Sequence, residues 1–295
     1  MTARRPRLRM ATVVLWPAWL LVFAAYIGTM AWTVQISLTS SKLLPVNDFV
    51  GLSQYRRLFS SSRWLVSLEN MAIFGVLFIL GCLVIGFVLA VALDQHVRFE
   101  NTLRTIFLYP YAMSFIVTGL IWQWLMNPTL GIQKTIQAWG FEAFRFDWIV
   151  DRDMAIYAVV IAGIWQASGL VMALMLAGLR GIDSDLWKAT RIEGIPAWRV
   201  YLFIIVPMLR PIIITAIVLL SIGVVKAYDL VVALTSGGPG IASEVPAKFI
   251  MDNLFTRQNI ALATAAATVM LITVAAILMP WLYSEYFRRE RGRTA

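Results

Sequence analysis

The chain has 295 residues, of which 60% are apolar and only 14% are charged. An average soluble domain is roughly 45–50% apolar and about 25% charged, so this composition argues against an ordinary soluble enzyme. It also excludes a disordered, collagen-like or coiled-coil chain. The net charge of +9 would suggest nucleic acid in a soluble protein. In a membrane protein it records which loops stay in the cytoplasm, so we expect contact with lipid and no nucleic-acid partner.

Six apolar runs have about the length of 20 residues that a helix needs to cross a bilayer. They are Ala11–Leu38, Val66–Leu93, Leu103–Met126, Ala155–Leu179, Phe203–Val225 and Ile260–Tyr283. Four arginines precede the first run, as in a signal peptide, but the run exceeds the roughly 7–15 residues of such a segment. We therefore predict an all-α membrane protein with six transmembrane helices.

The distribution of basic residues predicts the orientation of these spans. With both termini in the cytoplasm, 15 of the 25 Lys and Arg residues fall on the inner side, in agreement with the positive-inside rule. The first outer loop is the exception, because it carries four basic residues. Within it, Gly51–Phe59 has apolar residues at roughly helical spacing, which predicts a short amphipathic segment at the outer surface.

Cysteine and histidine limit the chemistry further. The single cysteine, Cys82, lies inside an apolar run, which excludes an internal disulfide and a thiolate metal site. The single histidine, His96, lies in a loop with no zinc cluster or Ser-His-Asp arrangement around it. We therefore expect no metal ligands, no catalytic residues and no cofactor bound by this chain.

The loop between the fourth and fifth runs, Leu179–Pro211, has the pattern of a helix, a break and a second helix. Asp183 or Ser184 can cap the first helix, and Gly194 can take the left-handed position that ends it. Pro196 stands where a second helix would begin. The expected result is a compact exposed knob on the cytoplasmic side. The alternative interpretation is an ordinary surface loop.

This stretch resembles the EAA loop of binding-protein-dependent ABC importer permeases, through Lys188, Ala189, Thr190, Gly194 and Ile205-Val206-Pro207. The resemblance implies the fold of an ABC type I importer permease and a coupling helix that docks on an ATPase subunit. The implied contact residues are Trp187, Lys188, Ala189, Thr190, Arg191, Glu193, Gly194 and Pro196. Three positions depart from the pattern: the motif's Glu is Lys188, its second Ala is Thr190, and its Asp is Glu193. A salt bridge made by the motif's Glu is therefore not carried over, and Lys188 needs an acidic partner instead.

Further stretches extend the resemblance over nearly the whole chain. Ala227–Gly240 and Leu108–Asn127 are similar to the fifth-span exit and third span of the first permease of sugar importers of the maltose type, and Gly51–Phe59 to its outer segment. The LAGLRGI stretch and Ala227–Gly240 are closest to the glucose/mannose type. The implied regions are residues 1–65 with the first span and outer loop, 66–284 with five helices and the coupling loop 180–207, and a basic tail at 285–295.

The resemblance also implies partners. The chain has no phosphate-binding loop of the GxxxxGK[ST] type, because its Gly-rich segment at 237–240 lacks the lysine. ATP and Mg²⁺ would therefore be used by a separate ATPase. The implied complex is a heterodimer with a second, homologous permease, two ATP-binding subunits and a periplasmic sugar-binding protein at the bacterial inner membrane. Transport would follow alternating access.

A sugar site in a membrane cavity needs aromatic faces and neutral polar groups. Three clusters offer them: Trp165, Gln166 and Ser168 in the fourth run; Lys226, Tyr228 and Asp229 at the end of the fifth; and Trp122, Gln123 and Trp124 in the third. The resemblance places the first two clusters on the substrate pathway, with Trp122 as a further candidate. Alternatively, the tryptophans mark membrane interfaces, and Lys226 and Asp229, three residues apart on one helical face, pair with each other.

Two rival functions remain open at this point. Asp147 and Asp151 form a DxxxD motif, which in membrane transferases of the prenyltransferase kind holds Mg²⁺ and pyrophosphate, although here it lies in an outer loop beside Arg145 and Arg152. The second rival is an ABC permease for another solute, such as a maltose- or trehalose-like oligosaccharide, a glycerol phosphate or an amino acid. A phosphate substrate favours buried arginine, and none lies in the middle of a predicted span.

Overall fold

The computed structural model describes residues 15–95 and 97–291. Its described residues are mainly helical, with a single isolated bridge between Thr39 and Phe49 and no strands. They form two compact units, one within residues 63–248 and one made of residues 15–62 together with residues 249–291. The basic residues Arg4, Arg5, Arg7, Arg9 and Arg293, the start of the first predicted span and His96 lie outside the described residues.

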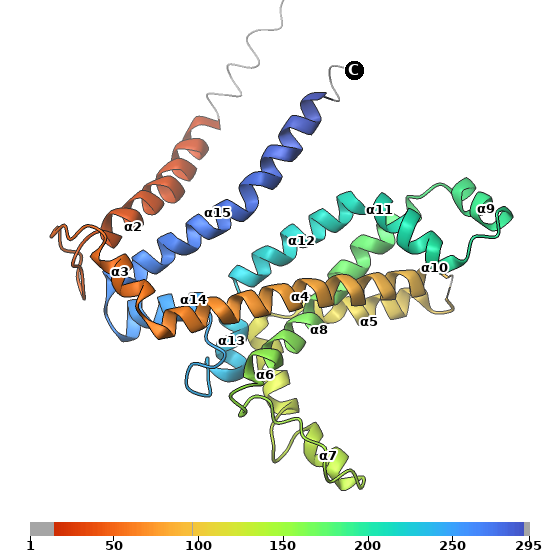
Figure 1. The fold of residues 1–295 in the computed structure, drawn as a ribbon, viewed down its shortest axis with the longest axis horizontal. Coiled ribbons are helices and arrows are strands. Elements are labelled where there is room, and N and C mark those ends of the chain that lie inside the picture. Colours follow the sequence, from red (N-terminus) through yellow and green to blue (C-terminus); the bar gives the residue numbers. More distant parts are fainter. Residues whose placement is uncertain (1–14, 96, 292–295) are drawn as a thin grey trace, which may run out of the picture. The chain divides into compact units, whose positions relative to one another are not determined.

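The unit of residues 63–248 holds most of the helices (Figure 1). Their bounds are α4 Ser62–Asp94, α5 Glu100–Ala112, α6 Phe115–Leu125, α7 Ile132–Ala138, α8 Ala155–Arg180, α9 Ser184–Ile192, α10 Ala197–Arg199, η2 Val200–Ile205, α11 Val206–Met208, α12 Arg210–Val225, α13 Tyr228–Thr235 and α14 Pro246–Met251. The segment η2 is a π-helix. The boundary between the two units falls within α14, after Lys248. Figure 1 shows α9 and α7 far apart within this unit, as expected for segments predicted on opposite sides of a membrane.

The core of this unit forms around α8, whose side chains are mostly buried. Small residues let neighbouring helices approach it. A Cβ added to Gly86 of α4 would lie 2.7 Å from Val171, and one added to Gly169 would overlap the carbonyl oxygen of Phe107 in α5. Glycine at such positions permits close helix packing in membranes. The fourth predicted run is therefore the central helix of the unit.

The third predicted run is broken rather than continuous. Helices α5 and α6 are bent by 101° at Met113 and Ser114. Met113 has extended backbone, and the Oγ of Ser114 accepts a hydrogen bond from the N–H of Val117, which caps α6. Pro110, inside the last turn of α5, removes a further helical donor. The sequence contained these stop and start signals, but the apolar run concealed them.

The fifth predicted run is broken in the same way. The helical stretch Ala197–Met208 and α12 are bent by 70° at Leu209. Pro211 occupies the first turn of α12, where its missing N–H costs nothing. In the preceding stretch the π-helical turn of η2 changes the face that each side chain presents. The predicted single helix Phe203–Val225 is therefore two helical pieces.

The second unit contains the π-helix η1 Phe23–Gly28, α2 Thr29–Ser37, α3 Ser53–Phe59, the π-helix η3 Asp252–Thr256 and α15 Ile260–Arg291. Helix α15 packs against α2 and α3. The backbone N–H groups of Ile260 and Ala261 donate to the carbonyls of Lys42 and Ser41, which fixes the start of α15 on the loop after α2. The predicted amphipathic segment Gly51–Phe59 contains α3, and Leu58 is its fully buried residue.

Three helices are long and apolar enough to cross a membrane alone: residues 15–37, α4 and α8. The two bent pairs bring the total to five if each is one span, and α15 contributes a shorter apolar stretch, Ile260–Ala276. These segments overlap with the six predicted runs, while the number of spans and the position of the termini stay predictions. The predicted domain limits at 65 and 284 also stay predictions.

Candidate functional site

Helix α9 has well-defined ends. The side chain of Asp183 accepts a hydrogen bond from the N–H of Asp185 over 3.0 Å, so Asp183 rather than Ser184 is the N-cap. At the other end, Gly194 has φ +66°. Its N–H donates to the carbonyl of Arg191, and the N–H of Ile195 donates to that of Thr190. This pair of bonds is a Schellman motif, as the glycine predicted. Pro196 stands as the N-cap of α10.

The residues of the predicted coupling loop divide between two faces of α9. Thr190 is buried and Trp187 is half-buried, with its ring against Tyr201 at a centroid distance of 5.6 Å. The exposed residues are Lys188, Ala189, Arg191, Glu193, Gly194 and Pro196, together with Ile192, which is 86% exposed. The exposed face is thus a small surface of mixed charge around one apolar side chain.

Lys188, which replaces the acidic residue of the motif, has an acidic neighbour on its own helix. Its Nζ lies 2.8 Å from Oδ1 of Asp185, three residues earlier. Both side chains are strongly exposed, so the pair contributes little to stability. On the exposed face of α9, Lys188 therefore stands beside a carboxylate and is not an isolated positive charge.

Ion pairs join the helix ends next to α9. Arg180, the last residue of α8, lies 2.7 Å from Glu100 at the start of α5 and 3.8 Å from Asp94 at the end of α4. The sequence placed all three residues on the inner side. At the predicted outer side, Arg63 lies 2.6 Å from Glu244. Both sets of contacts join residues that the charge distribution assigned to the same side.

The aromatic and amide residues of the third and fourth runs meet at the α5–α6 break. Trp122 of α6 and Trp165 of α8 lie edge to face, with ring centroids 6.0 Å apart. The neighbouring Gln166 donates from Nε2 to the carbonyl of Met113 over 2.8 Å. We call Met113, Thr118, Trp122, Trp165 and Gln166 the aromatic corner.

Three buried polar atoms of the aromatic corner have no hydrogen-bond partner among the described residues. They are Oγ1 of Thr118, Nε1 of Trp122 and Oε1 of Gln166. Buried polar groups of proteins are usually paired, so these three atoms are exceptions within the described residues. Sequence reasoning missed Thr118, although it stands one helical turn before Trp122. Ser168 is also buried, two residues after Gln166 on α8.

The predicted cluster of Lys226, Tyr228 and Asp229 is arranged differently from the expectation. Lys226 caps the end of α12, whereas Tyr228 and Asp229 open α13. The two charged residues therefore do not share one helical face, and within residues 15–95 and 97–291 no ion pair joins them. No side-chain hydrogen bond of the described chain connects this cluster to the aromatic corner. Helix α13 itself packs on α6, where Ala233 lies against Gly119.

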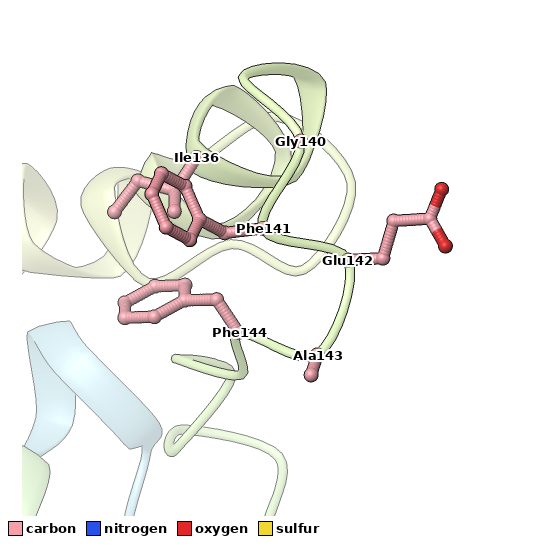
Figure 2. Close-up of a pocket in the computed structure, with 6 residues that line it drawn as sticks. All are labelled: Ile136, Gly140, Phe141, Glu142, Ala143 and Phe144. Atoms are coloured by element: carbon pink, nitrogen blue, oxygen red, sulfur yellow. The ribbon is translucent and has the colours of Figure 1, made fainter.

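The described segment around the DxxxD motif, predicted to lie on the outer side, shows no arrangement suited to a metal. Asp151 accepts a hydrogen bond from the N–H of Asp153 in a local turn. No group of three acidic, His or Cys residues that could hold a metal occurs in the part of the chain that the structure describes. An open pocket of about 680 Å³ lies nearby, between the end of α7 and the following loop (Figure 2). Its lining is mainly apolar, Glu142 points away from it, and it shares no residue with the predicted sites.

Comparison with known proteins gives a consistent result. The family model "binding-protein-dependent transport system inner membrane component" matches residues 82–288. A probable ABC transporter permease protein of Pyrococcus horikoshii is 35% identical over 98% of this chain and 99% of its own length. A xylose/arabinose import permease protein of Haloferax volcanii is 33% identical over 92% of this chain and 86% of its own length.

A solved structure supports the same fold. A chain of a bacterial alginate ABC transporter, solved with a periplasmic protein that holds an alginate pentasaccharide, aligns with a TM-score of 0.76. The alignment covers 97% of this chain and 96% of the other, at 18% identity. At that identity the likeness concerns the fold alone.

Proposed function

The chain belongs to the family of binding-protein-dependent transport system inner membrane components, and from this premise we propose that it is the permease subunit of an ATP-driven carbohydrate importer. Members of this family are non-catalytic transport subunits, so the alternative interpretation as a transferase with Asp147 and Asp151 is wrong. The observation that carries the carbohydrate assignment is the aromatic corner. Indole rings stack on the C–H faces of sugars, and the buried Gln166 and Thr118 groups suit hydroxyls.

The partners follow from the family and from α9. A soluble binding protein delivers the sugar at the outer face, and two ATPase subunits use ATP and Mg²⁺ on the inner face. The exposed face of α9, with Ile192 at its centre, is the docking surface for one ATPase subunit. A second, homologous permease completes the pathway. Both termini lie in the cytoplasm, because the inner side then carries most of the basic residues.

The chemistry of the site favours an uncharged sugar. The polar atoms of the aromatic corner are neutral, and the basic residues Arg63 and Arg180 are engaged by carboxylates at the two ends of the unit. A phosphorylated solute would gain from a buried cation in the pathway. We infer a monosaccharide of the glucose or mannose kind, as the resemblance of Ala227–Gly240 suggests. The relative named as a xylose/arabinose import permease supports a monosaccharide, and a maltose- or trehalose-like oligosaccharide stays the alternative.

The test is reconstitution. The chain is expressed with the permease, ATPase and binding protein of its gene neighbourhood, and the complex is purified and placed in liposomes. We expect ATP-dependent uptake of radiolabelled D-glucose or D-mannose, in preference to D-xylose, maltose and sn-glycerol 3-phosphate. Uptake of glycerol phosphate alone would contradict a carbohydrate site. An ATPase that does not co-purify with the chain would contradict the role of α9.

A further inference from the structure

Tyr201 connects the segment α9 with the long helix α4. Its ring centroid lies 5.6 Å from that of Trp187 on α9 and 6.3 Å from that of Phe87 on α4. Gln95, the residue directly after α4, donates a hydrogen bond from Nε2 to Oη of Tyr201 over 3.2 Å. One half-buried side chain therefore contacts α9 on one side and the inner end of α4 on the other.

The backbone on both sides of α9 is poorly suited to carry a displacement. The helix is separated from α8 by Gly181–Asp183 and from α10 by Glu193–Pro196. The second of these joints includes Gly194 in the left-handed region. Neither joint is a rigid helical element, and coupling between distant sites is carried by packed side chains and rigid secondary structure. The ring of Trp187 against Tyr201 provides such a packed contact.

The elements that contain or contact Tyr201, η2 and α4, are suited to respond to a displacement of α9. Tyr201 lies in the π-helix η2, and π-helical turns occur often at functional sites. Phe87 meets its ring edge to face, with an interplanar angle of 80°. Helix α4 is continuous over 33 residues from Ser62 to Asp94. A displacement applied at its inner end therefore moves a long stiff element that reaches the predicted outer side.

We propose that Tyr201 is a positioning residue that passes the displacement of α9 on to α4 through the ring contacts Trp187–Tyr201–Phe87, with Gln95 holding its hydroxyl. The inference rests on the proposed function, since it takes α9 as the surface that an ATPase subunit moves. It adds a defined route from that surface into the spans. The ring of Tyr201 makes the contacts that pass on the displacement, and the hydrogen bond from Gln95 to its hydroxyl holds the ring in place.

Three variants separate these roles. Tyr201→Leu removes the ring and the hydroxyl, whereas Tyr201→Phe keeps both ring contacts and removes only the hydrogen bond from Gln95. The matched control is Phe203→Leu. Phe203 lies two residues later in η2 and is 69% exposed, with its ring against Trp198 rather than against α4 or α9.

The measurement uses the whole transporter in nanodiscs. Cys82 is buried and is the single cysteine of the chain, so Cys82→Ala gives a background for labelling. Spin labels are attached at Leu80→Cys in α4 and Ile116→Cys in α6, both exposed positions of the same unit. Their distance distribution is recorded by double electron–electron resonance without nucleotide and after trapping with ATP and vanadate. Co-purified ATPase and the ATPase rate are measured in the same samples.

In the labelled parent we expect trapping to shift the distance distribution. Tyr201→Leu should lose at least half of that shift with the ATPase still bound, while Tyr201→Phe and Phe203→Leu keep most of it. A full shift in Tyr201→Leu, or an equal loss in Phe203→Leu, would overturn the inference. Loss of the ATPase from Tyr201→Leu would also overturn it, because Tyr201 would then support docking rather than transmission.

The parent complex separates the inference from the function on which it rests. If no ATPase co-purifies with the parent, the proposed function fails and the inference fails with it. If the ATPase is bound and trapping shifts the distance distribution in the parent, the distance distributions of the variants alone decide whether Tyr201 transmits the displacement. Should Tyr201→Leu fail to accumulate in the membrane as a folded permease, Phe87→Leu interrupts the same route from the α4 side. It should lose part of the shift, and a full shift there would contradict the route.

Discussion

Trp122 and Trp165 lie edge to face, at an interplanar angle of 74° and a centroid distance of 6.0 Å. The contact joins α6, which follows a sharp break, to α8, which is the central helix of its unit. Aromatic pairs of this kind contribute about 0.5–1.5 kcal/mol beyond the area they bury. The pair joins α6 to α8 next to Gln166, whose amide is held by its hydrogen bond to the carbonyl of Met113.

The first prediction concerns that amide. Gln166→Ala should raise the half-saturation concentration for uptake about 3- to 10-fold without loss of assembly, because one hydrogen bond to a sugar hydroxyl contributes about 0.5–1.5 kcal/mol. Uptake of the sugar that the binding protein accepts is measured in liposomes. Gln123→Ala is the control, since Gln123 is a half-buried glutamine of the neighbouring α6. Unchanged uptake kinetics in Gln166→Ala would remove the aromatic corner from the pathway.

The second prediction concerns the end of α9. Gly194→Glu should weaken docking of the ATPase, because a side chain in the left-handed region costs about 1–2 kcal/mol and the added charge lies on the exposed face. No heavy atom lies within 4 Å of a Cβ added there, so the effect is not a steric clash. Gly194→Asn serves as the control, since asparagine tolerates this backbone region. Normal co-purification and stimulated ATPase activity in Gly194→Glu would contradict the prediction.

The third prediction concerns packing between α5 and α8. Gly169→Ala should destabilise the chain by about 1–3 kcal/mol, because the added Cβ overlaps the carbonyl oxygen of Phe107. Thermal unfolding in detergent measures the change. Gly28→Ala is the matched control in a helix where nothing lies within 4 Å of the added Cβ. It should be neutral or slightly stabilising. Equal melting temperatures for both variants would indicate that α5 and α8 are less tightly packed than described.

The fourth prediction concerns the loop before α14. The amide of Asn70 donates to the carbonyls of Ala242 and Glu244 over 2.9 and 3.0 Å, and the residue is buried. Asn70→Asp keeps the shape but removes both donors, which should cost about 2 kcal/mol or more. Thermal unfolding again provides the measurement.

The control for Asn70 is Asn127, whose side chain accepts hydrogen bonds instead of donating them. Oδ1 of Asn127 accepts three hydrogen bonds, from the backbone of Thr129 and Leu130 and from the hydroxyl of Thr129. Asn127→Asp preserves all of these acceptor contacts, so it should leave stability nearly unchanged. If both aspartate variants unfold at the same temperature, the donor role of Asn70 is wrong.

The sequence predicted the helical class and the regions in which the apolar helices lie. Apolar runs of about 20 residues are typical of helices that cross a membrane. The sequence also predicted the ends of α9, with Asp183 or Ser184 at the start and Gly194 at the end, because caps are local signals. It did not predict the breaks at Met113 and Leu209, because the long apolar stretches on both sides outweighed Ser114 at the first break and Arg210 and Pro211 at the second. Contacts between distant residues, such as Gln166 with Met113 or Tyr201 with Phe87, depend on how helices pack and leave no local pattern.

The break between α5 and α6 also has a consequence for the surrounding lipid. At Met113 and Ser114 the backbone leaves its helical hydrogen-bonding pattern within a predicted span. Acyl chains offer no hydrogen bonds, so irregular backbone at membrane depth is stable only against protein or water. This flank of the permease must therefore be shielded from acyl chains, and changes of chain length or saturation in the bilayer should leave the break unaffected.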